Sequence, residues 1–578
     1  MEGLRTRPHF CYGIRYMPSL LFHLREAALL VVSVALSFAA FPQQPAPSAA
    51  LQPPQSTAKP SLGNEACRKC HAEISKSYSS TAMAQASGPA MQGLLTGDFV
   101  HVPSRVHYRV YTEDGKAWMS FDRPGDNEIR GKKELLHFIG TGHRGRTYLF
   151  SQDGFVFEAP INWYGQQHLW DMAPAYQKDR EIPMNLPAVS SCLACHTSNS
   201  QPPVPGTENR YDQPLFAHAG VTCERCHGEG AAHLESGGGT IVNPAKLSAE
   251  RRDAICMGCH FEGRVAIQQP GRSLADFQAG DKLSDFVHYF VLTGNSDDRI
   301  GALSQTEALS QSVCKRKSGD KMTCISCHDP HFTPPKEQAV AYYRAKCLAC
   351  HGEQFAAKHK SKERDCRVCH MPASSTSDIA HTQATDHRIL RKPQSAVPSA
   401  QPQTEQRLLP FPVDSGAPAA RDLGLAWESL AQQGVKNADT QADQWLRKAV
   451  LEAPNDAGVL AALGYEEQKR GLTQQAREHY LRALAIDPLS NEAALNLGVI
   501  EAQAGNADRA IKLWQGPFDR IPGRSEVGMN LALLYCSTGK MEKARATIAQ
   551  VLKFNPDLTP ARNLQRQLNA DPATCGTR

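Results

Sequence analysis

A five-residue pattern, Cys-x-x-Cys-His, occurs seven times between residues 67 and 370 and contains fourteen of the 18 cysteines. Two thiols three positions apart, followed at once by an imidazole, attach a haem through two thioethers and ligate its iron from the proximal side. The pattern therefore predicts covalent c-type haem at each copy. The copies are Cys67-Cys70-His71, Cys192-Cys195-His196, Cys223-Cys226-His227, Cys256-Cys259-His260, Cys324-Cys327-His328, Cys347-Cys350-His351 and Cys366-Cys369-His370.

Paired cysteines also build zinc sites, redox pairs and disulfides. None of these needs a histidine directly after the second cysteine. Histidine makes up only 22 of 578 residues, so a histidine after all seven pairs is not a coincidence of composition. The repeated pattern favours haem over the three alternatives.

The formal net charge is +5, which gives no basis for predicting a nucleic-acid partner. Each haem carries two propionates, so seven haems would add about 14 negative charges. We therefore expect the haem-loaded protein to be acidic overall.

The N-terminal segment, residues 1–41, resembles an export signal. Several arginines precede a 15-residue apolar run, Ala27–Phe41, which is shorter than the ~20 residues of a membrane span. We predict an exported, periplasmic protein, with an uncleaved membrane anchor as the alternative. Residues 42–63 are rich in Pro, Ala, Gln and Ser and form a disordered linker by composition.

Residues 64–390 are predicted to form a seven-haem domain. About 46 residues are present per haem between 67 and 390, too few for a conventional hydrophobic core. The macrocycles should therefore form the core, wrapped by short helices and loops. Residues 98–175 contain no motif and alternate around Asp114-Gly115 and Asp153-Gly154, which predicts two hairpins. The expected fold class is mainly α, with a small β-hairpin insert and then an α-solenoid.

Distal ligands are sufficient in number. Twelve histidines besides the proximal ones lie between 72 and 390, so seven haems could all be bis-histidine. Two imidazoles leave no open position on the iron, which suits electron transfer. His218, just before the third motif, is one candidate. Met83, 12 residues after His71, either ligates the first iron or packs.

The stretch 67–390 resembles the periplasmic multihaem c-type cytochromes that carry C-terminal tetratricopeptide (TPR) repeats. The resemblance rests on CERCHGEGAAH, VNPAKLSAERRDAICMGCH, CISCHDPHF, CRVCHMPA and, in the β-rich insert, GTGHRGRTYLF and INWYGQQHLWDMAP. It implies electron transfer, with His233 and His331 as distal ligands and His381 and His387 as further candidates.

The C-terminal part begins with a second Pro-rich linker, residues 391–420, which we expect to be a flexible tether. Prolines, alanines and glycines then recur every 34 residues, the signature of TPR helix pairs in residues 421–570. The expected repeats are 423–456, 457–490, 491–524 and 525–558, with a capping helix over 560–570. Gly516-Pro517 should break the second helix of the third repeat.

A TPR stack leaves a concave groove that binds a protein or peptide; dimerisation or a spacer role is the alternative. The sequence thus predicts a multihaem cytochrome that carries electrons between redox partner proteins and docks them through its TPR domain. A reductase or oxidase with one five-coordinate haem is an alternative, although no Cys-x-x-Cys-Lys motif is present. A scaffold with structural haems is the third. Whether the chain is an enzyme stays open, with a carrier favoured.

Overall fold

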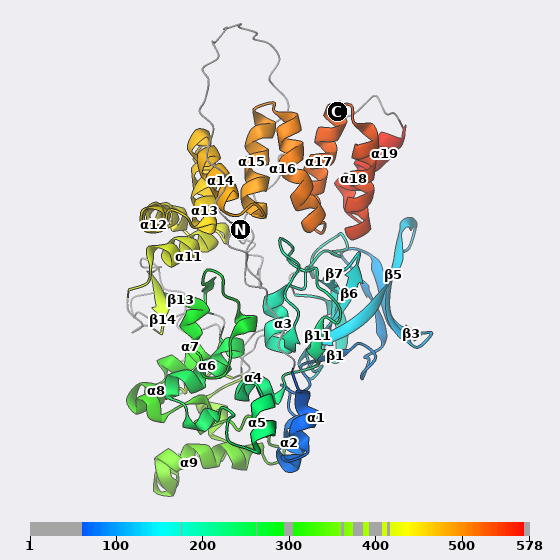
Figure 1. The fold of residues 1–578 in the computed structure, drawn as a ribbon. Helices are drawn as coiled ribbons and strands as arrows, with labels where there is room; N and C mark the ends of the chain where they lie inside the picture. The colour runs from blue at the N-terminus through cyan, green and yellow to red at the C-terminus, as the bar shows by residue number, and fades with distance from the viewer. Residues whose placement is uncertain are drawn as a thin grey trace.

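The computed structural model describes residues 61–174, 176–261, 263–293, 304–359, 363–373, 385–391, 407–412 and 417–570. The expected signal segment, most of the first linker and His381 lie outside the described residues. Three parts are visible in Figure 1: a large sheet, a group of short helices, and a row of paired helices above both. Among the described helices, none is long and apolar enough to cross a membrane.

The large sheet is antiparallel and has nine strands in the order β2-β3-β4-β5-β6-β8-β9, with β1 paired to β5 and β7 paired to β6. Alternating buried and exposed residues along β3 and β4 give the sheet one apolar face. The strands are β1 Ser87–Pro89, β2 Gly97–His101, β3 Val106–Glu113, β4 Lys116–Arg123, β5 Asp126–Ile139, β6 Gly145–Gln152, β7 Phe155–Glu158, β8 Ile161–Tyr164 and β9 Leu169–Met172.

Both hairpins expected from the sequence are confirmed. β3 and β4 are joined through Asp114-Gly115, and β6 and β7 through Asp153-Gly154. All four turn residues have positive φ, between 51° and 82°, as a two-residue type I′ turn requires. The insert is not small, however. Its buried aromatic and aliphatic side chains form a conventional core, so this part of residues 64–390 needs no macrocycle to fold.

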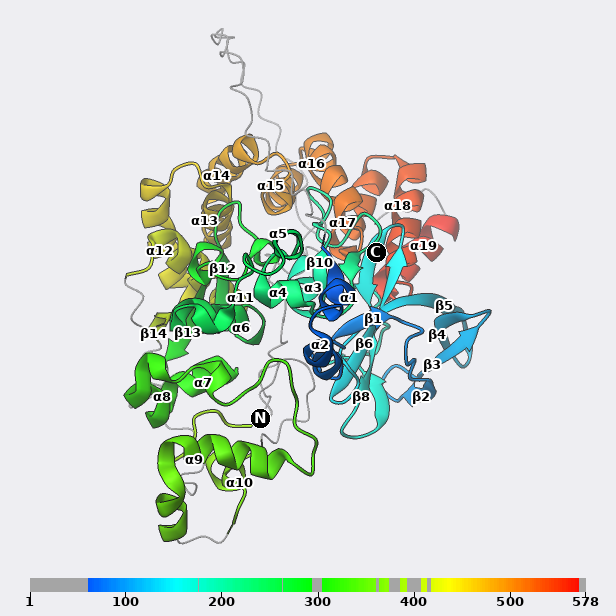
Figure 2. The same ribbon diagram turned by 60° about the horizontal axis from the view of Figure 1, so that its bottom comes forward.

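The haem motifs lie outside that sheet, mostly on short helices. Figure 2 shows α9 and α10 at the end of the molecule far from the paired helices. The helices are α1 Gly63–Arg68, α2 Ala72–Ser79, α3 Ser190–His196, α4 Cys223–His227, α5 Ala231–Ser236, α6 Ala249–His260, α7 Gln305–Gln311, α8 Val313–Ser318, α9 Ala339–Lys358 and α10 Cys366–His370, with 3-10 turns η1 Pro244–Lys246, η2 Leu274–Asp276, η3 Leu283–Asp285, η4 Gly319–Lys321 and η5 Cys324–Ser326.

Two smaller sheets complete this region. β10 (Ser198–Ser200) pairs with β11 (Phe216–His218), directly after the second haem motif. β12 (Val265–Gln268), β13 (Val287–Thr293) and β14 (Arg407–Phe411) form a three-stranded antiparallel sheet. β14 lies within the predicted second linker, so part of that segment is structured.

The C-terminal part consists of antiparallel helix pairs followed by a single helix, α19. Small residues allow the paired helices to cross closely: a Cβ at Gly464 would lie 2.8 Å from the Tyr480 ring, and one at Gly498 would lie 2.1 Å from Trp514. The helices are α11 Ala420–Gln432, α12 Ala438–Glu452, α13 Ala457–Lys469, α14 Thr473–Ile486, α15 Asn491–Gln503, α16 Ala507–Arg520, α17 Ser525–Ser537, α18 Met541–Phe554 and α19 Thr559–Ala570.

The predicted break at Gly516-Pro517 is wrong, because α16 continues through Pro517 to Arg520. Trp514 and Phe518 flank the proline and are buried in the core formed with α17 and α18. The packing of these two rings offsets the hydrogen bond that a proline removes from a helix interior.

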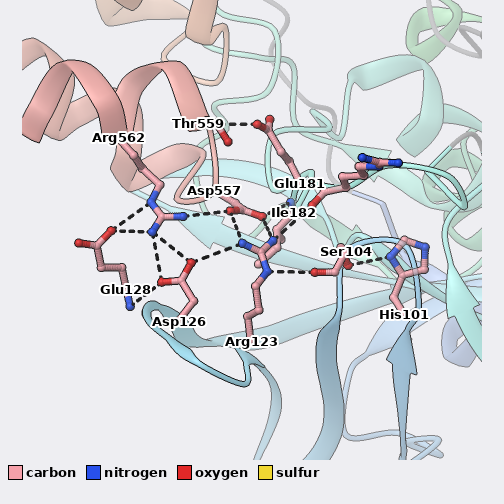
Figure 3. Close-up of polar contacts among 11 residues, drawn as sticks. His101, Ser104, Arg123, Asp126, Glu128, Glu181, Ile182, Asp557, Thr559 and Arg562 are labelled. Carbon is pink, nitrogen blue, oxygen red and sulfur yellow. Dashed lines mark hydrogen bonds and ion pairs between the residues drawn. The ribbon is translucent and has the colours of Figure 1, made fainter.

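The last repeat is locked onto the nine-stranded sheet (Figure 3). Asp557, 1% exposed, accepts hydrogen bonds from both terminal nitrogens of Arg123 and from the backbone N–H of Ile182. Arg562 on α19 reaches the carboxylates of Asp126 and Glu128 at 3.1 and 2.6 Å. Beside this network, Phe554 joins the apolar core of the sheet.

The first repeat is attached at the opposite end. Asp422 of α11 lies 2.6 Å from Nδ1 of His288 on β13, and α11 and α12 share an apolar cluster with β12, β13 and β14. The expected flexible tether is therefore wrong: the helical repeat is fastened at both ends and belongs to one packed molecule. The short strand β14 and the buried faces of α11 and α18 are the physical reason.

The Asp557 network can be tested by removing its carboxylate. Asp557→Ala removes the buried carboxylate and leaves half-buried Arg123 with only the 3.6 Å contact to Asp126 as an ion pair, so the free energy of unfolding of the full chain should fall by about 3–5 kcal/mol. Urea denaturation measures it. Asp508→Ala, which removes a fully exposed partner of Lys540, is the control and should leave the midpoint unchanged. Equal midpoints for both variants would contradict a locked interface.

Candidate haem sites

Each motif is folded so that its three functional side chains face the same way. A helical turn places residues i, i+3 and i+4 on one face. The backbone N–H of His71 donates to the Cys67 carbonyl at 2.9 Å, and that of His328 donates to Cys324 at 3.1 Å, which closes this turn. The two thiols and the imidazole can therefore approach one macrocycle from a single side.

Three proximal histidines lie opposite a second histidine from a distant part of the chain. The ring centroids of His71 and His233 are 6.3 Å apart with planes at 15°. Those of His227 and His331 are 5.9 Å apart at 13°. The third pair, His328 and His387, is 6.3 Å apart at 24°.

These distances fit an iron held between two imidazoles. Two metal–nitrogen bonds of about 2 Å, plus about 1.1 Å from each nitrogen to its ring centre, place the centroids of opposed ligands about 6.2 Å apart. Rings in direct stacking contact would lie closer than this. The three gaps therefore fit two axial ligands with a macrocycle between them, and the residues present suit the cofactor that the motifs imply.

The second nitrogen of several of these rings is already engaged. Nδ1 of His227 lies 3.0 Å from the Val242 carbonyl, and Nδ1 of His387 lies 2.9 Å from the Thr385 carbonyl. Such bonds fix the tautomer and direct Nε2 toward the metal. Burial also lowers the pKa of His328, His331 and His387, which favours the neutral imidazole that binds metal.

The other candidate distal ligands do not lie opposite a proximal histidine ring in these three pairs. Nε2 of His218 lies 3.1 Å from the Ser61 carbonyl oxygen, so this nitrogen is used there. Met83 is half-buried beside the strand that precedes the third motif, where its carbonyl accepts from Val221. In the sheet, His101 bonds Ser104, and His107 bonds Asp98.

The proximal histidines of four motifs fall outside the three pairs: His196, His260, His351 and His370. Burial lowers the pKa of His260. The ring of His351 contacts Phe355 at 5.1 Å. The sequence analysis did not predict a role for His359, but the ring of His359 lies 6.1 Å from that of His370. No motif surrounds His359, so only its position in the fold distinguishes it.

Thiols of different motifs lie against one another, which places the attachment sites side by side. Burial and the adjacent Cys67 thiol raise the pKa of Cys223 to about 12. A hydrogen bond with the Cys195 thiol lowers the pKa of Cys259 to about 6. These contacts bring the first motif to the third and the second to the fourth.

The later motifs are joined in the same way. A hydrogen bond with Cys256, together with burial, raises the pKa of Cys324 far above its usual value, which places the fourth and fifth motifs in contact. Burial and then the Cys366 thiol raise the pKa of Cys347 to about 11, which places the sixth beside the seventh.

Comparison with known families supports the same chemistry. A family model described as cytochrome c554 and c-prime matches residues 161–228, which include the second and third motifs. A doubled Cys-x-x-Cys-His model matches residues 317–356, which include the fifth and sixth. The multihaem cytochrome MtrA of Shewanella baltica is 28% identical over 182 residues, 29% of this chain and 54% of MtrA. The chain thus spans about half the length of this curated relative.

Solved structures with similar helical repeats include MamA from Desulfovibrio magneticus, 16% identical, covering 26% of this chain and 85% of that one, with a TM-score of 0.23. A tetratricopeptide repeat protein from Parabacteroides merdae is 19% identical and covers 27% of this chain and 62% of that one, with a TM-score of 0.24. The assignment of TPR-type repeats to this chain is based on its own 34-residue sequence period and on its paired helices.

Motifs and matched families together define a c-type cytochrome that binds haem c. The motifs and the matched families support a multihaem c-type cytochrome, and the chain adds a C-terminal repeat of TPR type.

The second pair can be tested by removing its distal histidine. His331→Ala should leave the iron ligated by His227 five-coordinate, so one haem per chain should change from low to high spin and bind carbon monoxide when reduced. Electron paramagnetic resonance (EPR) and optical titration measure both effects. His107→Ala, at a half-buried position on β3 of the nine-stranded sheet, should change neither. An unaltered spin state in His331→Ala would remove this ligand assignment.

Proposed function

We propose that this protein carries seven covalently attached haems and transfers electrons between redox partner proteins. The three opposed histidine pairs carry the proposal, because two strong-field imidazoles leave no position on those irons for a substrate. A bound haem supplies a one-electron site. The chain supplies the axial ligands, fixes their orientation through carbonyl contacts, and holds neighbouring attachment sites together.

The thiol contacts support a definite order of attachment sites. The first motif adjoins the third, the fourth adjoins the fifth, and the sixth adjoins the seventh. The Cys226 thiol also lies near that of Cys259, and the Cys327 thiol near that of Cys350, so these pairs would form one row. We propose that electrons pass along the order one, three, four, five, six, seven.

The second motif lies beside this row rather than within it, since Cys195 Sγ reaches the Gly258 carbonyl next to the fourth motif at 3.7 Å. Segments on both sides of it contact the helical repeat. Asn185 donates to the Gly523 carbonyl, and Glu208 pairs with Arg524 at 2.8 Å. The second site is therefore a side branch that lies under the TPR helices.

We further propose that the TPR domain docks a redox partner protein or peptide. A partner held there would have a higher effective concentration near the branch site. The domains proposed for this role are the haem region within 64–390 and the repeat within 421–570. Export to the periplasm, with residues 1–41 as a signal or anchor, agrees with covalent haem attachment and remains part of the proposal.

A second candidate function is reduction or oxidation of a small substrate at one open iron. It is favoured by His260 and His351, which face no second histidine ring among the described residues. An iron held by either one would have a free sixth position unless a residue other than a described histidine supplies a ligand. A high-spin EPR signal in the wild-type protein would favour this candidate.

The haem load tests the proposal directly. Seven haems should add about 4.3 kDa to the processed chain, at about 616 Da each. Intact mass of the denatured protein measures this, because thioether bonds survive denaturation. The matched control is the Cys369→Ser variant, which should lose one haem or hold it by a single bond. A wild-type mass with fewer than six haems would reject full occupancy.

A further inference from the structure

Among the described residues, the histidine that the sequence neighbourhood of the seventh motif suggests as its distal ligand faces a different site. His387 follows this motif, yet its ring faces His328 of the fifth motif. The ring that faces His370 belongs instead to His359, which precedes the seventh motif. The chain therefore offers this site a histidine from the opposite direction along the sequence.

The separation of these two rings agrees with the other pairs. Their centroids are 6.1 Å apart, within the range of 5.9 to 6.3 Å set by the three pairs described above. Their planes cross at 74°, whereas the other pairs lie between 13° and 24°. Ligation fixes the distance along the iron axis and leaves rotation about that axis free, so the same distance with a different angle is consistent with coordination.

The local fold explains how His359 reaches this place. Helix α9 is kinked at Gly352, where φ is 68° and ψ is 158°. A positive φ is costly for residues other than glycine, so this glycine allows the chain to turn immediately after the sixth motif. The helix ends at Lys358, and His359 follows as its C-terminal cap residue.

The proximal ring is also prepared for a ligand opposite it. Nδ1 of His370 lies 2.5 Å from the Leu390 carbonyl, which leaves Nε2 as the metal-facing nitrogen. The ring of Phe355 lies 6.1 Å from that of His359 and is 55% exposed. Exposed large apolar groups at a cofactor site are what a macrocycle would cover.

We propose that His359 is the distal ligand of the haem attached at Cys366 and Cys369, with its imidazole plane crossed relative to that of His370. This inference rests on the proposed function, since it requires the seventh motif to carry haem. Crossed imidazoles bring two iron d orbitals close in energy, while parallel imidazoles separate them. The seventh site should therefore give a low-spin EPR signal more anisotropic than those of the three parallel pairs.

The test compares His359→Ala with wild type and with His107→Ala, all as full-length haem-loaded protein. In His359→Ala the strongly anisotropic signal should disappear, one haem-equivalent of high-spin signal should appear, and the reduced protein should bind one additional carbon monoxide. His107→Ala should match wild type. Seven haems by mass with an unchanged spectrum in His359→Ala would overturn the ligand assignment.

A second variant separates this inference from the function on which it rests. His359→Met keeps a ligand of similar reach, so it should retain seven haems and gain the near-infrared charge-transfer band of thioether-ligated iron. A full haem load without that band would also overturn the assignment. Absence of haem from the seventh motif in wild type, by peptide mass mapping, would instead reject the seven-haem function.

Discussion

A haem iron takes axial ligands from both faces, and a Cys-x-x-Cys-His motif supplies only one of them. To close such a site, the chain must return to it with a second residue. It does so in a regular way: His233, His331 and His387 follow the third, fifth and seventh motifs, and they face the proximal histidines of the first, third and fifth. Each ligand pair thereby ties one segment of the cytochrome region to an earlier one.

This constraint explains why the motif region and the rest of the molecule differ in construction. Helices α4, α5, α8, α9 and α10 bury none of their own residues. Short helices with no apolar core are marginal in water, so ligation and macrocycle packing must hold them. The nine-stranded sheet and the helical repeat have their own apolar cores. Asp557 fastens the repeat to that sheet, and Asp422 fastens it to β13 of the three-stranded sheet.

The sequence could predict the features that local spacing determines. The seven motifs, the two Asp-Gly hairpins and the 34-residue helical period all follow from residues close together in the chain. Features that depend on contacts between residues far apart in the chain could not be predicted. Strand β14, Arg407–Phe411, lies in a Pro-rich stretch and forms only because β13 offers an edge. His359 has no local signature, and Pro517 is tolerated only through the packing of α16.

The central claim is that histidines outside the motifs supply the second axial ligand at most of the iron sites. Near-infrared magnetic circular dichroism of the oxidised, full-length protein tests this most directly, because its charge-transfer bands distinguish bis-histidine from histidine–methionine and from high-spin iron. We expect at least four haems per chain to show the bis-histidine band: those of the three near-parallel pairs and of the crossed His359–His370 pair. A spectrum dominated by high-spin or methionine-ligated iron would contradict it.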